Sequence, residues 1–378
     1  MYYIALQDEL IPWRSAMKTV EDAFCPNTDC KDYGVRNQGN IGKRGKYGKN
    51  NERTLLYCRT CGTRFAATKA TAFFGFHVSE DMIRQIIHHA AEGVGVRATA
   101  RLLGIDKDTV NRVILRVGEH CEAVLKNLLC SLQMTEAQLD ELWAFVKKKE
   151  PGCEQEHGKE TGQRWIWTVL DTPTRLIVSF LIGGRTLEDA RRFLKDVVMR
   201  SEKQPLFVSD ELPHYADVLK ELFHTVKNQE PTGRPGRPKK PDKVIDENLD
   251  YATVHKTRVN GRVVKVEKKV VYGSGERIEE KLKELPGNTI NTSFVERSNL
   301  NWRLWDAHLT RKSLLFAKSA RWLKAKFAIC VAFYNFIRPH ETLSRGKDRI
   351  FRPKTPAMAA GIVSHVWTIK ELIGYRLL

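Results

Sequence analysis

The sequence has no hydrophobic run long enough to cross a lipid bilayer, and it has too few acids to balance its bases. The most apolar late stretch, FAICVAFYNFI, is shorter than the roughly 20 residues that a spanning helix needs. The opening residues, MYYIALQDELIPWRSAMK, carry scattered charges, so we expect no signal peptide. These features predict a soluble, intracellular protein without a membrane partner.

The shortage of acids leaves a large positive charge. The 378 residues contain 63 Lys+Arg against 45 Asp+Glu, which gives a net charge of +18 and a pI near 9.5. Such an excess favours a polyanionic partner, most often nucleic acid. The length predicts two or three domains, and a hydrophobic content of 42% is enough to build their cores.

Cysteine is sparse, with 8 residues, but four of them form two close pairs. CPNTDC holds Cys25 and Cys30, and CRTCG holds Cys58 and Cys61 just before Gly62. Two thiolate pairs on short turns can build a tetrahedral zinc site. Free thiols and an iron–sulfur cluster are the alternatives. The other cysteines lack paired spacing and are expected to be ordinary buried residues: Cys121, Cys130, Cys153 and Cys330.

Three short helical patterns follow in SEDMIRQIIHHAAEGVGVRATARLLGIDKDTVNRVILRVGEHC. Ser79 can cap the first, RATARLLG forms the second and ends at Gly104, and the third begins near Asp106. This spacing is typical of a helix-turn-helix, although an unrelated helical hairpin would read similarly. Val110 and Val113 would face inward. The residues left to read base edges are Lys107, Thr109, Asn111 and Arg112.

The second half alternates between strand and helix patterns. QLDELWAFVKKK, RWIWTVLD and RLIVSFLIGG read as three strands, and Thr186 caps the helix LEDARRFLKDVV. PLFVSDELPHY is a fourth strand that ends at Asp210, before a helix over about 215–223. Asp140 lies inside the first strand. This order favours a ribonuclease-H-like α/β sheet in which a parallel fourth strand lies beside the first.

A third acid lies in NTSFVERSNLNWRLW, a helix that Thr292 or Ser293 could cap. Glu296 shares a helical stripe with Leu300 and Leu304, and a surface salt bridge would be its ordinary role. The predicted sheet offers another role, because Glu296 could pack beside Asp140 and Asp210. Clustered carboxylates repel one another unless Mg²⁺ or Mn²⁺ binds, and two such ions can cleave a phosphodiester. Arg303, two turns on, could contact a DNA phosphate.

Between Asp210 and Glu296 the pattern is interrupted. PTGRPGRPKKP carries Arg234 and Arg237 in two Gly-Arg-Pro units, which resemble an AT-hook but also suit a plain basic linker. The dipeptide Asn260-Gly261 then predicts a type I′ β-hairpin. No chemical role beyond a basic surface is predicted for this hairpin.

Together these motifs resemble the insertion-sequence-one family of DDE transposases. The resemblance rests on CPNTDC…CRTCG, the helix-turn-helix, LDELW, VSDELPHY, NTSFVERSNLNWRLW and YNFIRPHETL, and it spans residues 25–341. It implies that Asp140, Asp210 and Glu296 bind two Mg²⁺ or Mn²⁺ ions, and that Arg303 is the basic residue seven positions after the glutamate. The stretch 229–287 is longer than in compact members of the family.

The resemblance predicts a multidomain α+β protein. We expect a zinc ribbon at 1–75, an all-α helix-turn-helix at 76–131, a ribonuclease-H-like catalytic domain at 132–345 with a hairpin insertion at about 229–287, and a tail at 346–378. The partners would be double-stranded DNA, as terminal inverted repeats and target, and further copies of the chain in a homodimer or larger oligomer. The expected location is the prokaryotic cytoplasm, at the nucleoid.

Two other functions remain open at this point. A zinc and helix-turn-helix repressor with an inactive catalytic domain would share the N-terminal motifs, but would not need all three acids. A metal-dependent ribonuclease H or other nuclease would share the acids, but would not need a sequence-reading module at its N-terminus.

Overall fold

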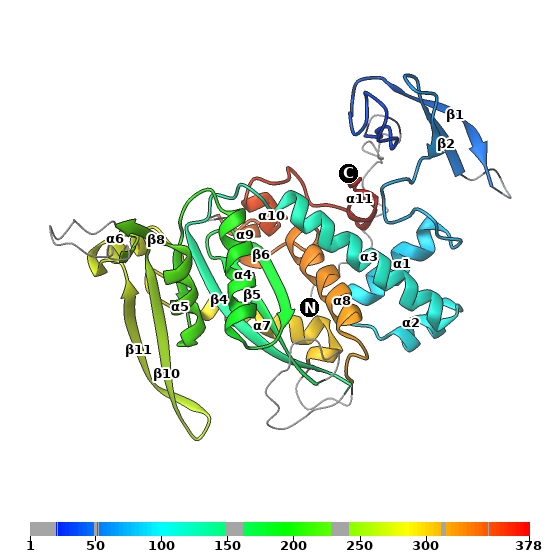
Figure 1. Ribbon diagram of the computed structural model, residues 1–378. Helices are drawn as coiled ribbons and strands as arrows, with labels where there is room; N and C mark the ends of the chain where they lie inside the picture. Colours follow the sequence, from blue (N-terminus) through cyan, green and yellow to red (C-terminus); the bar gives the residue numbers. More distant parts are fainter. Residues whose placement is uncertain are drawn as a thin grey trace, which may run out of the picture. The chain divides into compact units, whose positions relative to one another are not determined.

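The computed structural model describes residues 20–48, 51–147, 162–227, 242–310, 315–346 and 348–378, apart from positions 21 and 52 (Figure 1). The chain divides into two compact units, and the described residues of the smaller one come from both ends of the sequence. Unit 1 contains Met1–Gln85 with Thr368–Leu378, and unit 2 contains Ile86–Trp367. Residues 368–378 of the predicted tail therefore belong with the N-terminal cysteines.

Unit 1 is built on a small antiparallel sheet of β1 (Ile41–Tyr47), β2 (Arg53–Cys58) and β3 (Arg64–Ala66). Its core combines cysteines with apolar side chains that include Ile41, Leu56 and Phe65. The C-terminal helix α11 (Ile369–Gly374) joins this unit through backbone hydrogen bonds. The amide of Ala72 donates to the carbonyl of Ile373 over 3.0 Å, and that of Leu377 to Ala70 over 2.9 Å.

Three helices follow, as the sequence predicts: α1 (Glu80–Ala91), α2 (Val96–Leu103) and α3 (Lys107–Leu128). Gly104 ends α2 in the left-handed region with φ 64°, which glycine adopts without steric cost. Asp106 caps α3 by accepting from the amides of Asp108 and Thr109.

Unit 2 centres on a six-stranded mixed sheet in the order β11-β10-β7-β4-β5-β6. The strands are β4 (Glu136–Val146), β5 (Gly162–Asp171), β6 (Ile177–Gly183), β7 (Leu206–Ser209), β10 (Tyr251–Val259) and β11 (Arg262–Tyr272). β4, β5 and β6 are antiparallel neighbours, and β7 lies parallel to β4. The predicted order of these four strands is confirmed.

The predicted hairpin forms within the stretch that the sequence marks as an insertion. Asn260 and Gly261 have φ 51° and 79°, which suit a type I′ turn. However, β10 pairs in parallel with β7 through Tyr251–Thr253, so both strands extend the main sheet. The hairpin's root is anchored because Val254 packs with Ile278 and Leu282 in a buried cluster.

Helices cover both faces of this sheet (Figure 1). On one face, Trp167 of β5 contacts Phe193 of α4 (Leu187–Arg200) and Tyr215 of α5 (Pro213–Leu222). Thr186 caps α4 as predicted, by accepting from the amide of Asp189 over 3.2 Å. The sheet core is thereby closed on this side by large aromatic side chains.

On the other face lie α7 (Ser293–Trp305) and α8 (Ala320–Ala332). Phe180 of β6 contacts Phe327 of α8, and Phe327 also contacts Trp302 of α7. Helix α3 packs closely on α8 at Gly118, where an added Cβ would lie 2.3 Å from the carbonyl oxygen of Ala325. This approach leaves no room for a side chain at that position.

The remaining elements are short. They are β8 (His224–Lys227), β9 (Asp242–Ile245), α6 (Gly275–Lys283), the 3₁₀ helix η1 (Ala307–Leu309), the π-helix η2 (Phe333–Ile337), α9 (Glu341–Ser344) and α10 (Pro356–Ala359). Within the described ranges, no helix combines the length and apolar character that a bilayer crossing requires.

Two sequence expectations need correction. The apolar stripe of α7 does not run through Leu300 and Leu304, which are 49% and 74% exposed, because the helix instead buries Val295 and Trp302 against the sheet side. Cys121 and Cys330 are buried as expected, but Cys130 is exposed after the end of α3, and Cys153 lies outside the described residues.

Candidate functional site

Asp140 lies in the middle of β4, on the central pair of strands, and is half-buried. Its Oδ1 accepts from the amide of Glu141 over 2.8 Å. Its Oδ2 accepts from the Nδ2 of Asn299, one turn beyond Glu296 on α7, over 2.7 Å. The carboxylate is therefore held from two elements that lie 159 positions apart in the sequence.

Asp210 follows the last residue of β7, beside Asp140. The parallel register pairs Gln138 with Val208, and extending that register by two residues places Asp210 opposite Asp140. Neighbouring strands lie about 4.8 Å apart. The Oδ1 of Asp210 accepts from the amide of Leu212 over 3.2 Å, which fixes the turn into α5. Two acids thus meet at the carboxyl end of β7.

Glu296 lies in the first turn of α7, and β4 holds that end of the helix. The Oε1 of Gln138 accepts from the amides of Phe294 and Val295, each over 3.2 Å. This contact replaces the predicted cap, because Thr292 makes no side-chain capping bond. The hydroxyl of Thr292 instead donates to the Oε1 of Glu296 over 2.5 Å.

Lys256 of β10 also binds Glu296, through its ammonium group and the same Oε1. The Lys256 ammonium donates in addition to the Thr292 hydroxyl over 3.2 Å. The contact is only half-buried, because the Glu296 side chain is 43% exposed. Glu296 therefore has a counter-ion from the strand that the sequence places in an insertion.

Burial, and to a lesser extent mutual repulsion, raises the pKa of both aspartates. Burial, and then the negative charge of Asp210, raise the pKa of Asp140 to about 7, and Glu296 adds to the effect. Burial likewise raises the pKa of Asp210. A bound cation would relieve this repulsion, because it favours the charged form of each carboxylate.

The three carboxylates do not form a tight cluster, and a cavity is lined by Asp210 and Glu296 but not by Asp140. Among the described residues, only the four paired cysteines bring three or more ligand-type side chains within 4.8 Å of one another, so the oxygens of Asp140, Asp210 and Glu296 do not all meet that spacing. Asp210 and Glu296 line a cavity of about 440 Å³, which is also lined by the cationic side chains Arg185, Lys256 and Arg258 and by His255. A cavity lined by both carboxylates and cationic side chains suits an anionic ligand that binds together with metal cations.

Glu141, next to Asp140, is held away from this cavity by two partners. Its Oε2 accepts from the Nη2 of Arg185 over 3.0 Å, and the hydroxyl of Tyr215 donates to its Oε1. The guanidinium of Arg185 also stacks over Trp165, 4.7 Å from the ring centroid. Sequence reasoning missed Arg185, because nothing in the local pattern links it to a strand 44 positions earlier.

The predicted base-reading residues lie on the first turns of α3. Lys107 and Arg112 are exposed, while Thr109 and Asn111 are half-buried. The buried side of the same turns is formed by Val110 and Val113, both 0% exposed, as predicted. The Nη2 of Arg112 donates to the hydroxyl of Thr109 over 3.3 Å.

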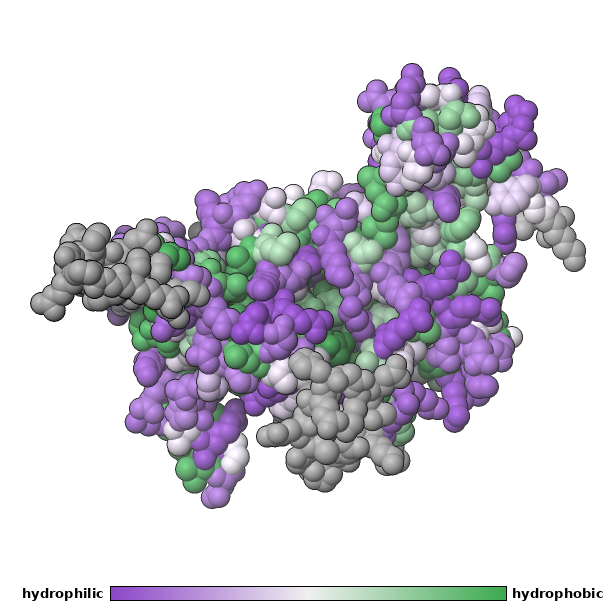
Figure 2. Space-filling model, in the orientation of Figure 1, coloured by the Kyte–Doolittle hydropathy of each residue, from purple (hydrophilic) through white to green (hydrophobic). Residues whose placement is uncertain are grey.

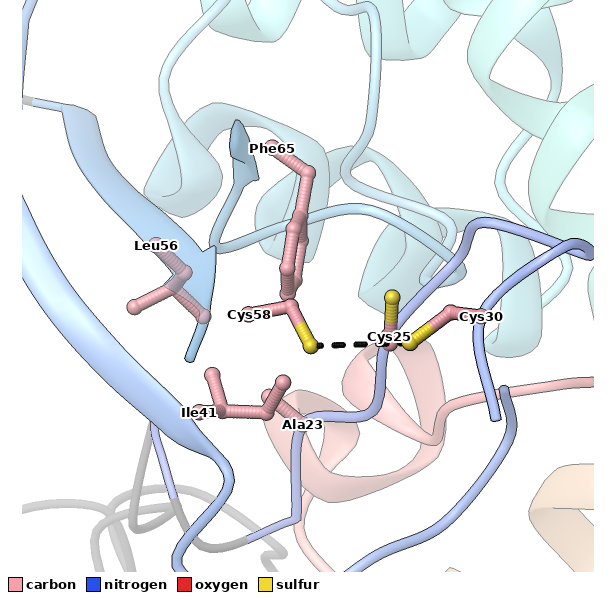
Figure 3. Packing of buried hydrophobic residues seen from close by; sticks show 7 residues of the cluster. All are labelled: Ala23, Cys25, Cys30, Ile41, Leu56, Cys58 and Phe65. Carbon is pink, nitrogen blue, oxygen red and sulfur yellow. Dashed lines mark hydrogen bonds between the residues drawn. The ribbon is translucent and has the colours of Figure 1, made fainter. Parts of the chain in front are cut away.

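The four paired cysteines converge in unit 1 and could hold a metal ion. The Sγ atoms of Cys25 and Cys61 lie 3.6 Å apart, and those of Cys30 and Cys58 lie 3.9 Å apart. Figure 3 shows Cys25, Cys30 and Cys58 gathered beside the end of β2. A tetrahedral site with Zn–S bonds of about 2.3 Å requires sulfurs about 3.8 Å apart. The donor set therefore fits zinc.

Three predicted DNA contacts remain. Arg303 lies two turns after Glu296 on α7 and is half-buried. Arg234 and Arg237 lie outside the described residues.

Comparisons with known proteins give partial likenesses. No protein-family model matches the chain. A stretch of 87 residues is 36% identical to the guanine nucleotide exchange factor DBS of Rattus norvegicus, covering 23% of this chain and 8% of that protein. Two solved structures are similar at a TM-score of 0.17. The first, a Mos1 transposase paired-end complex with the left transposon end, is 14% identical and covers 38% of this chain and 56% of that one.

The second solved structure is a Mos1 mariner paired-end complex with Mn, 12% identical over 34% of this chain and 52% of that one. The chain thus spans about a twelfth of the DBS protein and about half of each Mos1 chain. These likenesses assign neither a family nor an activity.

Proposed function

We propose that this protein is a DNA transposase of the DDE type, with Asp140, Asp210 and Glu296 as its catalytic acids. It would bind the terminal inverted repeats of an insertion sequence, cleave the phosphodiester at each end and transfer the 3′-hydroxyl ends to target DNA. The observation that carries the proposal is the proximity of the three acids: Asp140 on β4 lies beside Asp210 at the end of β7 and is hydrogen-bonded by Asn299 of α7. Asp210 and Glu296 also line one cavity together with several cations. The finer assignments, to a ribonuclease-H-like domain and the insertion-sequence-one family, belong to the same proposal.

The three acids are the residues that would hold two Mg²⁺ or Mn²⁺ ions. Hard carboxylate oxygens are the ligands these cations prefer. The pKa of Asp140 is raised first by burial and then by the charge of Asp210. When bound, such ions activate a water or hydroxyl nucleophile and stabilise the leaving oxygen of a phosphodiester. Asn299 orients Asp140 by its hydrogen bond, and Gln138 holds the start of α7.

The cations of the cavity would bind the DNA backbone. Arg185 is fixed by Glu141 and Trp165, so its exposed edge is preorganised to meet a phosphate. Lys256 on β10 forms an ion pair with Glu296. Once the acids bind metal, the Lys256 ammonium can leave this carboxylate and bind a phosphate oxygen of the DNA instead. The chain's side chains thereby position the scissile group, while no covalent protein–DNA intermediate is needed.

DNA sequence would be read in the N-terminal half. We propose that the four cysteines form a zinc ribbon, and that α2 and α3 form a helix-turn-helix with Lys107, Thr109, Asn111 and Arg112 at base edges. Binding to paired element ends suits a homodimer or larger oligomer in a prokaryotic nucleoid. The AT-hook-like role of Arg234 and Arg237 stays a prediction.

One observation favours a second function. Lys256 neutralises Glu296 where a metal ligand is proposed, and a permanent ion pair there would leave a repressor with an inactive catalytic domain. Incubating the purified protein with DNA that contains one element end, with and without Mg²⁺, separates the two. A transposase yields nicks at the element end only with Mg²⁺, whereas a repressor binds the same DNA and leaves it uncut.

A further inference from the structure

The β10–β11 hairpin extends well past the strands beside it. Pairing of β10 with β7 covers residues 251–253, whereas pairing with β11 continues to Val259. Figure 1 shows the turn end projecting beyond the sheet, and Figure 2 shows this end as mainly hydrophilic with a few hydrophobic residues near the tip. Beyond the part of β10 that pairs with β7, the ribbon has two strands and most of its residues are exposed.

The charge of this ribbon favours a polyanion. Residues 251–272 contain one acid, Glu267, and six strong bases: Lys256, Arg258, Arg262, Lys265, Lys268 and Lys269. Four exposed valines lie among them: Val259, Val263, Val264 and Val266. Interleaved cationic and β-branched side chains on a narrow ribbon suit the groove and backbone of duplex DNA, because the major groove admits a two-stranded β-ribbon.

The two faces of the ribbon differ. Side chains alternate along a strand, and the cross-strand register pairs Val254 with Lys268 and Lys256 with Val266. Lys256, Arg258 and Lys268 therefore share one face, which bears no acid. This face lies toward α7, because Lys256 binds Glu296 and the Lys268 ammonium donates to the Thr289 hydroxyl.

The opposite face differs because it carries the one acid of the ribbon, Glu267. His255 pairs with Glu211 at 2.6 Å, and Lys265 pairs with Glu267 at 2.7 Å. Lys269 belongs to the same face through its pairing with Thr253. The first face contributes two cations, Lys256 and Arg258, to the lining of the candidate cavity, whereas the opposite face contributes His255.

We propose that the Lys256, Arg258 and Lys268 face of the β10–β11 ribbon binds the phosphate backbone of duplex DNA as it enters the carboxylate cavity. The inference rests on the proposed function and adds a DNA-binding surface separate from α3. Arg258 and Lys268 would make the outer phosphate contacts, and Lys256 the contact beside Glu296.

The test compares two double variants that remove the same charge from opposite faces. Arg258→Ala with Lys268→Ala changes the proposed face, and Lys265→Ala with Lys269→Ala is the matched control. Fluorescence anisotropy measures binding of a labelled element-end duplex in the presence of Ca²⁺. The salt concentration is varied between 50 and 200 mM, because affinity that depends on phosphate contacts falls steeply over this range. Thermal unfolding checks that each variant is folded, and Arg258→Ala alone serves if the double variant is not.

Each phosphate contact contributes about 0.9 to the slope of log K against log salt, which is about eightfold in affinity at 0.1 M salt. The first double variant should therefore lose about 1.8 from the slope and roughly 10- to 60-fold in affinity. The control should lose about threefold or less.

If both double variants lose the same DNA affinity, or neither loses any, the ribbon proposal is wrong. The proposed function still stands in that case, provided that the wild-type protein cleaves the element end. A wild type that binds no duplex overturns the proposed function as well. Unlabelled competitors give a further check. If single-stranded RNA or an acidic peptide displaces the labelled duplex more effectively than unlabelled duplex does, the inference is contradicted, because the face would then bind another polyanion.

Discussion

Replacing Gln138 with Leu should weaken the connection between the strand that carries Asp140 and the helix that carries Glu296. Gln138 is fully buried, and its Oε1 accepts from the amides of Phe294 and Val295 at the start of α7. A leucine fills similar space but accepts no hydrogen bond, so two amides at a helix N-terminus lose their partner. Each lost bond costs about 1 kcal/mol net, and an orphaned buried donor up to about 3 kcal/mol. The free energy of unfolding should fall by roughly 2–4 kcal/mol.

Urea denaturation followed by tryptophan fluorescence measures this loss, with an unchanged m-value indicating that the unfolding reaction is the same. Gln133→Leu is the matched control, because Gln133 is exposed and hydrogen-bonds only at the surface with Glu202. It should change stability by about 0.5 kcal/mol or less. A Gln138→Leu protein that is as stable as its control would refute the reasoning that Gln138 holds α7 in place.

Three further predictions concern other parts of the chain. Elemental analysis should find about one zinc per chain, and changing both Cys58 and Cys61 to Ser should remove it and weaken element-end binding. Asn111→Ala and Arg112→Ala should each cost roughly 1–3 kcal/mol on the element end but little on random duplex, as anisotropy can measure. Burial raises the pKa of Glu136 from 4.5 to about 7, so the folded state holds a proton that the unfolded state releases, and stability should fall as pH rises from 4.5 to 7. Glu136→Gln should remove the Glu136 share of that fall, about 3 kcal/mol, as chemical denaturation at pH 5 and pH 8 can measure.

The features predicted correctly from the sequence depend on short-range chemistry. Asn260-Gly261 specifies its turn through positive φ angles, Asp106 and Thr186 cap the helices that follow them, and Gly104 ends α2 in the left-handed region. Strand patterns of apolar alternation also predicted the order of β4, β5, β6 and β7. These signals reside within a few residues of one another, so a single sequence carries them.

The features that were missed join distant segments. Gln138 meets the start of α7 across 156 positions, and Lys256 meets Glu296 across 40. No local pattern marks either pair. The placement of β10 beside β7 is also non-local, so the sequence did not show that the hairpin extends the main sheet. Helix α7 has two apolar stripes, one with Leu300 and Leu304 and one with Val295 and Trp302. The second faces the core, because the large Trp302 side chain is buried there.

The most direct test of the central claim is element-end DNA cleavage by Glu296→Gln in Mg²⁺, beside wild type. The substitution keeps the size and the helix but removes the negative charge, and the exposed half of the side chain makes a folding defect unexpected. We predict normal end binding with loss of both strand cleavage and strand transfer, since the same acids serve both steps. Asp140→Asn and Asp210→Asn should behave alike, and the triple variant should be hardly worse, whereas Arg303→Ala should only weaken activity. A Glu296→Gln protein that still cuts the element end would contradict the account.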